Sequence, residues 1–373
     1  MQTTFDKTLI SPELWKGKIL ASENSLHHIS PYIGKMKSSM ARTLIEACST
    51  EGQLVFDPFV GSGIVALESL LAGRGIISCD INPYAVALTK AKIFAPQSLS
   101  EALKLAKYYL GTSKSECKNI NLEEVPEWVR LFFHPKTLTE TLALARVLKL
   151  DNQDFLLGCL LGILHHQRPG FLSFPASHAV PYLRSRKFPA SVFPELYEYR
   201  DVESRIIKKI ERAYRNTQEI DQKLKRSCFI SDASSLTLES ESIDAVVTSP
   251  PYMNTLDYVR DNRLRLWLID PQTKIEKTNP KNLSEFQSLM HDCLSRLRPA
   301  LRPNGLCAIV TGEINSESSH CINTAETILQ EADRVNEFTC EAVVEDQIPN
   351  VRRVRKRGAK VKREWIVVLR KRF

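Results

Sequence analysis

Short runs of hydrophobic residues alternate along this chain with stretches whose hydrophobic residues recur at helical spacing. This alternation is typical of a parallel sheet whose strands are joined by crossover helices. We expect an α/β, Rossmann-like, doubly wound sheet of seven strands, the last two forming an antiparallel hairpin. The predicted strands are Leu54–Phe59, Gly75–Ile81, Ser227–Ser231, Ile243–Thr248, Gly305–Thr311, Cys340–Ile348 and Glu364–Arg370.

Residues 95–225 interrupt this rhythm and divide the predicted core into two halves, 1–94 and 226–373. The intervening stretch is too long for a simple crossover connection, so we interpret it as an inserted, mostly helical subdomain. Its predicted helices are Ser98–Leu110, Leu138–Leu148, Phe155–His165 and Val202–Leu224, and a Pro-rich, aromatic-rich loop spans Arg168–Pro194.

A glycine-rich turn follows the first predicted strand. The strand leads into Asp57, Pro58 and Phe59, then into Gly61 and Gly63, and the next hydrophobic stretch has helical spacing. Glycines at such a turn let the backbone approach a ligand closely, and ligands of open α/β sheets bind beyond the carboxyl ends of the strands. A dinucleotide site would favour a third glycine where Ala66 stands. The pattern therefore indicates a different nucleotide-like cofactor.

Two further acids follow the next two strands. Asp80 ends the second strand and is placed to bind ribose hydroxyls, with Ile81 and Asn82 directly after it. Asp232 and Ala233 follow the third strand, where a carboxylate is a natural acceptor for an adenine amino group. We expect all of these residues to line one cofactor site.

The most specific motif is Ser249-Pro250-Pro251-Tyr252, which follows the fourth predicted strand. Pro251 has no N–H and restricts the residue before it, so the chain leaves the sheet in a rigid, extended form. The Ser249 hydroxyl and the Pro250 carbonyl can accept hydrogen bonds from an amino group. Tyr252 offers a ring on which a flipped base can stack. We interpret these four residues as a catalytic clamp around an exocyclic amine.

Together, the Asp57–Gly63 and Thr248–Tyr252 motifs resemble the amino-methyltransferases of DNA, the N4-cytosine/N6-adenine group. The resemblance implies a class I methyltransferase fold, S-adenosyl-L-methionine as cofactor, and a site-specific enzyme of the kind found in restriction–modification. It also implies that Tyr32 and Lys35, in a Pro-Tyr-Ile-Gly-Lys segment, close over the methionine end of the cofactor. Serine before Pro-Pro-Tyr favours cytosine N4.

Three alternatives stay open at this point. Adenine N6 is the first, and the second is an RNA target, because a similar pairing of motifs occurs in guanine-N2 methyltransferases of tRNA. The third is a nucleic-acid-binding protein that keeps the fold without the activity. This chain also differs from many Ser-Pro-Pro-Tyr members, in which that motif precedes the glycine-rich one.

Positive charge is concentrated at the end of the chain. The formal net charge is +8, and residues 352–373 hold eleven lysines and arginines against the single acid Glu364. Such a segment favours a polyanionic partner through phosphate contacts, and the family resemblance implies DNA rather than RNA. The expected contact residues are Arg352, Arg353, Arg355, Lys356 and Arg357. Basic and aromatic residues also alternate in the inserted loop, at Arg168, Phe171, Phe174, Tyr182, Arg184, Arg186, Lys187 and Phe188.

Other candidate chemistries are weaker. The nine cysteines include no Cys-x-x-Cys pair, so we expect reduced structural thiols and no zinc site. Adjacent His165 and His166 would point in different directions on a helix, which makes them poor metal ligands. No hydrophobic run is long enough to cross a membrane, and we expect a cytoplasmic protein. After the catalytic motif, we expect Asp257 to cap a helix, Tyr258 to line the base pocket, and Arg265 to lie at the helix surface or in packing.

Overall fold

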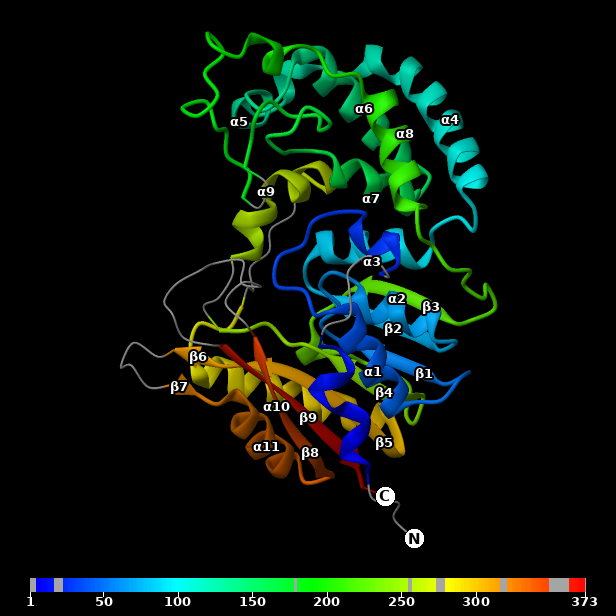
Figure 1. Cartoon of the computed structure of the whole chain (residues 1–373), viewed down its shortest axis with the longest axis vertical. Coiled ribbons are helices and arrows are strands. Elements are labelled where there is room, and N and C mark those ends of the chain that lie inside the picture. Colours follow the sequence, from blue (N-terminus) through cyan, green and yellow to red (C-terminus); the bar gives the residue numbers. More distant parts are fainter. Residues whose placement is uncertain are drawn as a thin grey trace.

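The structure is a computed structural model that describes residues 5–16, 23–177, 180–253, 257–272, 279–315, 321–348 and 362–372. Its centre is a seven-stranded sheet in the order β3-β2-β1-β4-β5-β9-β8 (Figure 1). The strands are β1 (Leu54–Asp57), β2 (Gly75–Asp80), β3 (Arg226–Ile230), β4 (Ile243–Thr248), β5 (Leu301–Gly312), β8 (Phe338–Ile348) and β9 (Lys362–Lys371). A separate two-stranded ribbon pairs β6 (Ile314–Asn315) with β7 (Cys321–Ile322).

The first five strands of the sheet run parallel, and β9 runs antiparallel to both β5 and β8. Strand β8 therefore runs parallel to the core strands, and its carboxyl end lies at the same edge as that of β4. The predicted class I, Rossmann-like fold, with an antiparallel pair at its end, is confirmed. The strand order also places the crossover point between β1 and β4, where open α/β sheets bind ligands.

Helices cover both faces of the sheet because side chains alternate along each strand. On one face, Val55 and Val247 pack with α1 (Ser38–Cys48), α2 (Ile64–Leu71) and α3 (Pro83–Ile93). On the other face, Phe56 and Val246 pack with α10 (Leu283–Ala300) and α11 (Thr324–Val335). Single-turn 3-10 helices complete the described secondary structure, at Lys7–Ile10, Pro12–Leu14, Ser25–His28, Cys117–Asn119, Leu122–Glu124, Pro194–Tyr197 and Ala233–Ser235.

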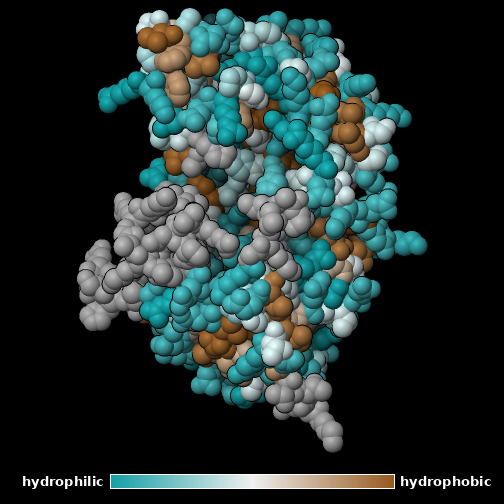
Figure 2. Space-filling view, in the orientation of Figure 1, coloured by the Kyte–Doolittle hydropathy of each residue, from teal (hydrophilic) through white to brown (hydrophobic). Residues whose placement is uncertain are grey.

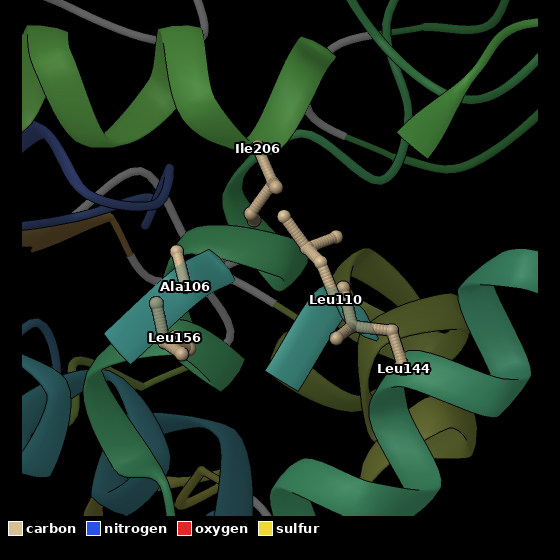
Figure 3. A pocket seen from close by; sticks show the side chains of 5 residues that line it. All are labelled: Ala106, Leu110, Leu144, Leu156 and Ile206. Carbon is tan, nitrogen blue, oxygen red and sulfur yellow. The ribbon is translucent and has the colours of Figure 1, made fainter. Parts of the chain in front are cut away.

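A helical layer lies beyond α3, at the top of Figure 1. It contains α4 (Leu99–Glu116), α5 (Glu127–Arg130), α6 (Pro135–Leu150), α7 (Asp154–Gly162) and α8 (Val202–Ala213). Its hydrophobic core is continuous with residues of α3 and of α9 (Tyr258–Ile269), the helix that follows the catalytic motif. Between α4, α6, α7 and α8 lies a pocket with an entirely apolar lining, formed by Ala106, Leu110, Leu144, Leu156 and Ile206 (Figure 3).

Two glycines let α7 approach its neighbours closely. A Cβ on Gly158 would lie 2.3 Å from the Cβ of Ala91 in α3, and one on Gly162 would lie 1.9 Å from the carbonyl oxygen of Ile29. No other residue type fits these positions without movement of the backbone. The Gly-x-x-x-Gly spacing in α7 therefore fixes how the helical layer packs on the cofactor half of the core.

The structure corrects two expected helix ends and decides between two expected places for Arg265. Helix α8 ends at Ala213 instead of Leu224, because the backbone of Asn216 bonds Ser25 instead of continuing the helix. The Asn216 carbonyl accepts the Ser25 N–H at 2.8 Å, and the Asn216 N–H donates to the Ser25 hydroxyl over 2.9 Å. Helix α7 ends at Gly162, before the two histidines. Of the two places expected for Arg265, the helix surface and packing, the structure shows packing: the residue is 1% exposed, and Nε donates to the Leu161 carbonyl over 3.2 Å.

None of the described helices is long and apolar enough to cross a membrane. Eight of the nine cysteines are recorded as free thiols, and most of these eight are buried. The face seen in Figure 2 is largely hydrophilic, with hydrophobic residues in small groups.

Candidate cofactor and catalytic site

A single hydrogen bond joins the two motifs. Thr248, the last residue of β4, donates its hydroxyl to the Asp57 carboxylate over 2.6 Å, and Asp57 is the last residue of β1. The two strands are parallel neighbours, with Phe56 opposite Val246. The glycine-rich turn and the Ser-Pro-Pro-Tyr motif therefore leave the sheet side by side at the same edge, although about 190 residues separate them in the chain.

Asp80 organises the turn from the next strand. One oxygen of its carboxylate accepts the Gly61 N–H at 2.9 Å, and the other accepts the Asn82 N–H at 2.9 Å. The Asn82 side chain in turn caps α3 by accepting the Tyr84 N–H at 3.0 Å. Each Asp80 oxygen keeps lone-pair capacity beyond these bonds, so the carboxylate can also accept from ribose hydroxyls.

The turn itself has a left-handed backbone. Gly61 and Gly63 have φ values of +48° and +72°, and a Cβ on Gly63 would lie 2.6 Å from the Thr89 hydroxyl. Behind the turn, the fully buried Lys92 of α3 donates a hydrogen bond to the Ser62 carbonyl. Burial lowers the pKa of Lys92 to about 7, since a charged amine is disfavoured there. Thus α3 holds the turn in a shape that only glycine at position 63 permits.

Both strand-end acids have raised pKa values. Burial raises the pKa of Asp57 to about 7, partly offset by its bonds from Thr248 and from the Phe59 N–H. Burial raises the pKa of Asp80 to about 6, against the stabilising backbone donors of Asn82 and Gly61. Perturbed carboxylates that converge on one strand edge are a mark of functional sites.

Three stacked tyrosines form a wall beside Asp80. Tyr32 stacks on Tyr84 with ring centroids 5.9 Å apart and on Tyr258 at 5.7 Å, and its ring lies 3.5 Å from the Cβ position of Gly61. The Asp80 carboxylate is close enough to raise the pKa of Tyr258, whose shift comes mainly from burial. Tyr258 therefore lies on the cofactor side, at the start of the helix that follows the catalytic motif. Asp257 caps that helix by accepting the Arg260 N–H at 2.9 Å.

The catalytic motif lies across β5 and β9. Tyr252 donates its hydroxyl to Oε1 of Glu364 in β9 over 3.2 Å, and its ring covers Gly312 of β5. Burial, and next the nearby Glu364 carboxylate, raise the pKa of the Tyr252 phenol well above its usual value. Pro250 is buried and Pro251 is half-buried. All four residues of the predicted clamp thus lie next to the end of β4.

The remaining predicted cofactor residues lie around the same edge. Ile81 is 36% exposed although it is apolar, Pro58 is buried, and Phe59 is half-buried. Asp232 caps a short helix through the Ser234 N–H at 2.9 Å, with Ala233 buried beneath it. Lys35 is exposed, and its charge is near enough to Lys92 to contribute to the lowered pKa of that amine.

The structure does not test the nucleic-acid contacts predicted for the basic segment. Arg352, Arg353, Arg355, Lys356 and Arg357 lie outside the described residues. The aromatic residues of the inserted loop mostly pack against one another or their neighbours: Phe171 on His166, Phe174 on Tyr197 and Phe188 on Phe193. Tyr182 is 50% exposed. Arg263 of α9 holds this loop by donating to the Pro181 carbonyl over 2.8 Å, so the loop is fixed to the helix that follows the catalytic motif.

The two histidines have structural contacts. His165 is buried with Nδ1 3.0 Å from the Ser177 carbonyl, and His166 accepts the Arg168 N–H at 3.0 Å. Within the described part of the chain, no cluster of three or more His, Cys, Asp or Glu side chains could hold a metal ion.

Sequence reasoning missed Lys92 and Glu364 as parts of this site. Lys92 lies on an ordinary helical pattern, and Glu364 stands out in the sequence only as the one acid in a basic segment. Their roles depend on which strands and helices are neighbours, which the spacing along the chain does not encode. The isolated acid at 364 is the one signal that could have drawn attention to that position.

Comparisons with known proteins agree with the motifs. Residues 10–91 match the family model described as DNA methylase, the N6/N4 methyltransferase family. The chain is 26% identical over 281 residues to the type II methyltransferase M.MvaI of Kocuria varians. The aligned region covers 67% of this chain and 60% of that protein. It is 25% identical over 309 residues to the type II methyltransferase M.BsoBI of Geobacillus stearothermophilus, covering 75% of this chain and 59% of that protein.

The chain thus spans about three fifths of the length of these two relatives. Among solved structures, TrmN from Thermus thermophilus aligns with a TM-score of 0.35 at 11% identity, covering 91% of this chain and 50% of that one. A similarity at that score has no bearing on function. Residues 10–91 are thus similar to the N6/N4 DNA methylase family, the family that the two motifs resemble.

Proposed function

We propose that this chain transfers a methyl group from S-adenosyl-L-methionine to an exocyclic amino group of a base in DNA, with cytosine N4 as the preferred target. The observation that supports this most is the 2.6 Å hydrogen bond between Thr248 and Asp57. This bond holds the glycine-rich turn and the Ser-Pro-Pro-Tyr motif next to each other at one edge of the sheet, as a methyl donor and an amine acceptor would require. The family match and the type II methyltransferase relatives support DNA as the substrate class.

The residues around the glycine turn fit the cofactor. Asp80 is oriented by two backbone donors and can accept from ribose hydroxyls. Ile81 offers an exposed apolar side chain directly after it, suited to the face of an adenine ring. The left-handed Gly61 and Gly63 leave room for close backbone approach. When bound there, S-adenosylmethionine supplies a methyl group already activated on sulfur.

The residues of the second motif suit an amine nucleophile. The lone pair of an exocyclic amine is delocalised into its ring, so the nitrogen must become more tetrahedral to attack. The Ser249 hydroxyl and the Pro250 carbonyl can each accept one of its hydrogens, which favours that geometry. Tyr252 provides the stacking face for a flipped base. Transfer to an activated methyl group then depends mainly on alignment of the two reactants.

DNA would approach the edge where β4 and β8 both end. The basic residues Arg352, Arg353, Arg355, Lys356 and Arg357 follow β8 in the sequence, and phosphate contacts by such residues position a duplex without reading its sequence. The helical layer, whose loop is bound to α9 through Arg263, is our candidate for target recognition. A restriction–modification role fits the names of the type II relatives.

The test is transfer of labelled methyl from S-adenosylmethionine to DNA, followed by nuclease digestion and mass spectrometry of the nucleosides. We expect N4-methylcytosine. Asp80→Asn should weaken cofactor binding in calorimetry, whereas Tyr252→Ala should abolish transfer and leave cofactor affinity largely intact. Glu326→Gln, an exposed acid on the remote helix α11, is the matched control and should change neither.

The same assay separates the alternatives. N6-methyladenine in the digest would move the target to adenine, and transfer to tRNA or rRNA without transfer to any DNA would replace DNA by RNA. No cofactor binding, even with DNA present, would refute the enzyme assignment in favour of a binding protein.

A further inference from the structure

Tyr84 of α3 holds the segment that leads into Tyr32. Its hydroxyl donates to the Pro31 carbonyl over 2.6 Å and lies 2.6 Å from the Ser30 hydroxyl. A phenol has one proton to donate, so Ser30 must be the donor in the second bond. Tyr84 and Ser30 are both buried, so neither bond competes with bulk water. Two hydrogen bonds therefore fix the backbone directly before Tyr32.

Tyr84 is itself fixed relative to Asp80, the acid that the proposed function assigns to the ribose hydroxyls. One Asp80 oxygen accepts the Asn82 N–H at 2.9 Å, and the Asn82 side chain accepts the Tyr84 N–H at 3.0 Å. The guanidinium carbon of the buried Arg265 lies 5.4 Å from the centroid of the Tyr84 ring. Because both its backbone and its ring have fixed neighbours, Tyr84 is a rigid support for the Tyr32 segment.

These contacts form a closed circuit at the glycine-rich turn. From Tyr84 the circuit passes through Pro31 to Tyr32, whose ring lies 3.5 Å from the point that a Cβ on Gly61 would occupy. The Gly61 N–H then donates to the other Asp80 oxygen over 2.9 Å. Every step of the circuit is a hydrogen bond, a covalent link or a packing contact. The circuit therefore sets the position of the Tyr32 ring relative to the Asp80 carboxylate.

The strand order indicates which part of the cofactor the Tyr32 ring would meet. Asp80 ends β2, whereas Gly61 belongs to the turn after β1, one strand nearer to β4 and the Ser-Pro-Pro-Tyr motif. A cofactor whose ribose lies on Asp80 and whose methyl group faces that motif must extend across the end of β1. The part that passes Gly61 and Tyr32 is then the sulfonium with its methionine chain, and the adenine lies on the other side of Asp80.

We propose that Tyr84 is a positioning residue that sets the Tyr32 ring against the methionine portion of S-adenosylmethionine, at a distance from Asp80 that fits the bound cofactor. This inference rests on the proposed function, because it specifies how the same site takes its methyl donor. A wall that is already in place lowers the cost of ordering the site on binding. Without the two bonds, the segment populates other positions, and the apparent affinity falls in proportion to the fraction of molecules that can bind.

The experiment compares two ligands by calorimetry: S-adenosylmethionine, and 5′-methylthioadenosine, which keeps the adenine and ribose but lacks the amino-acid portion. Tyr84→Phe removes only the hydroxyl. Loss of two buried hydrogen bonds predicts S-adenosylmethionine binding that is about 5- to 100-fold weaker, with the affinity for methylthioadenosine within about twofold of the wild type. Ser30→Ala leaves the bond from Tyr84 to Pro31 in place, so it should weaken S-adenosylmethionine binding less, by about 2- to 10-fold.

The matched control is Tyr214→Phe. The Tyr214 hydroxyl donates to the Pro96 carbonyl over 2.6 Å, a bond of the same kind that lies outside the circuit. This variant should lower Tm to a similar extent as Tyr84→Phe and change the affinity for neither ligand. Asp80→Asn should weaken the binding of both ligands, because both carry the ribose. In a Tyr32→Ala background, Tyr84→Phe should weaken S-adenosylmethionine binding no further, since Tyr84 acts through that ring.

Methyl transfer to DNA separates positioning from a general loss of stability. In Tyr84→Phe the KM for S-adenosylmethionine should rise, while kcat at saturating cofactor stays within about threefold of the wild type. Wild-type affinity for S-adenosylmethionine in Tyr84→Phe, equal losses of affinity for the two ligands, or additive effects of Tyr84→Phe and Tyr32→Ala would each overturn the inference. A wild type that binds S-adenosylmethionine but methylates no DNA fails the proposed function alone, because the calorimetric comparisons need no DNA. A wild type that binds neither ligand fails both.

Discussion

Asp57 provides a quantitative test of the junction between the two motifs. Its carboxyl is 2% exposed, accepts hydrogen bonds from Thr248 and Phe59, and has a pKa raised to about 7 by burial. The folded state therefore holds a proton on Asp57 at pH values where the unfolded chain, with a pKa near 3.8, has lost it. This contribution to stability is fully present below pH 3.8 and is lost as pH rises through about 7.

The magnitude follows from the shift. One pKa unit corresponds to about 1.4 kcal/mol, so linkage predicts that Asp57 alone lowers the free energy of unfolding by about 2–3 kcal/mol between pH 5 and pH 8. Asp57→Asn removes the titration but keeps an acceptor for Thr248. The variant should therefore gain stability relative to the wild type as pH rises, by about 2–3 kcal/mol over that interval.

The assay is urea unfolding of the cofactor-free protein, followed by tryptophan fluorescence at several pH values from 5 to 8. Asp80→Asn serves as the graded comparison: the pKa of Asp80 is raised only to about 6, so the same interval should give a smaller relative gain of about 1–2 kcal/mol. Parallel stability curves for the wild type and Asp57→Asn would refute the reasoning, because they would mean that Asp57 is not a buried acid at this junction.

Three further predictions concern the packing behind the turn. Gly63→Ala must keep a left-handed backbone, at a cost of about 1–2 kcal/mol, and its Cβ would lie 2.6 Å from the Thr89 hydroxyl. The variant should still fold, but calorimetry should show S-adenosylmethionine binding that is at least about tenfold weaker. Gly158→Val should destabilise the chain by about 1–3 kcal/mol or more in urea unfolding, since even a Cβ would lie 2.3 Å from that of Ala91; an unchanged midpoint would contradict the close approach of α7. Burial lowers the pKa of Lys92 to about 7, so its contribution to stability is present above pH 10.5 and is lost as pH falls through 7. The free energy of unfolding of the wild type should therefore rise by about 2–4 kcal/mol from pH 7 to 10, and Lys92→Met should abolish this rise. A wild type without that rise would count against a buried amine.

The strands were the most predictable part of the fold. Short hydrophobic runs such as Ile243–Thr248 coincide with β4, and the stretch of helical spacing after Gly63 forms α2. Local signals were sufficient there because a buried parallel strand is hydrophobic throughout and a glycine marks the start of the helix. The motif at Ser249 lies close to Asp57 because neighbouring parallel strands end at one edge of the sheet.

What the sequence could not predict depended on tertiary neighbours. The end of α8 is set by the backbone bonds between Asn216 and Ser25, nearly two hundred residues apart. Burial of Arg265 depends on the Leu161 carbonyl and on the Tyr84 ring, 5.4 Å away. Charged residues at such positions are expected at the surface from composition alone. Glu364 likewise acquires its role only once β9 is inserted between β5 and β8.

The most direct test of the account is a crystal structure with sinefungin, an analogue of S-adenosylmethionine that carries an amine in place of the methyl group. We predict that its ribose hydroxyls bond Asp80 and that its amine faces Ser249 and Pro250, leaving space for a base against Tyr252. A ligand bound at the opposite edge of the sheet, or one whose amine points away from that motif, would contradict the claim that the ends of β1 and β4 form one reaction site.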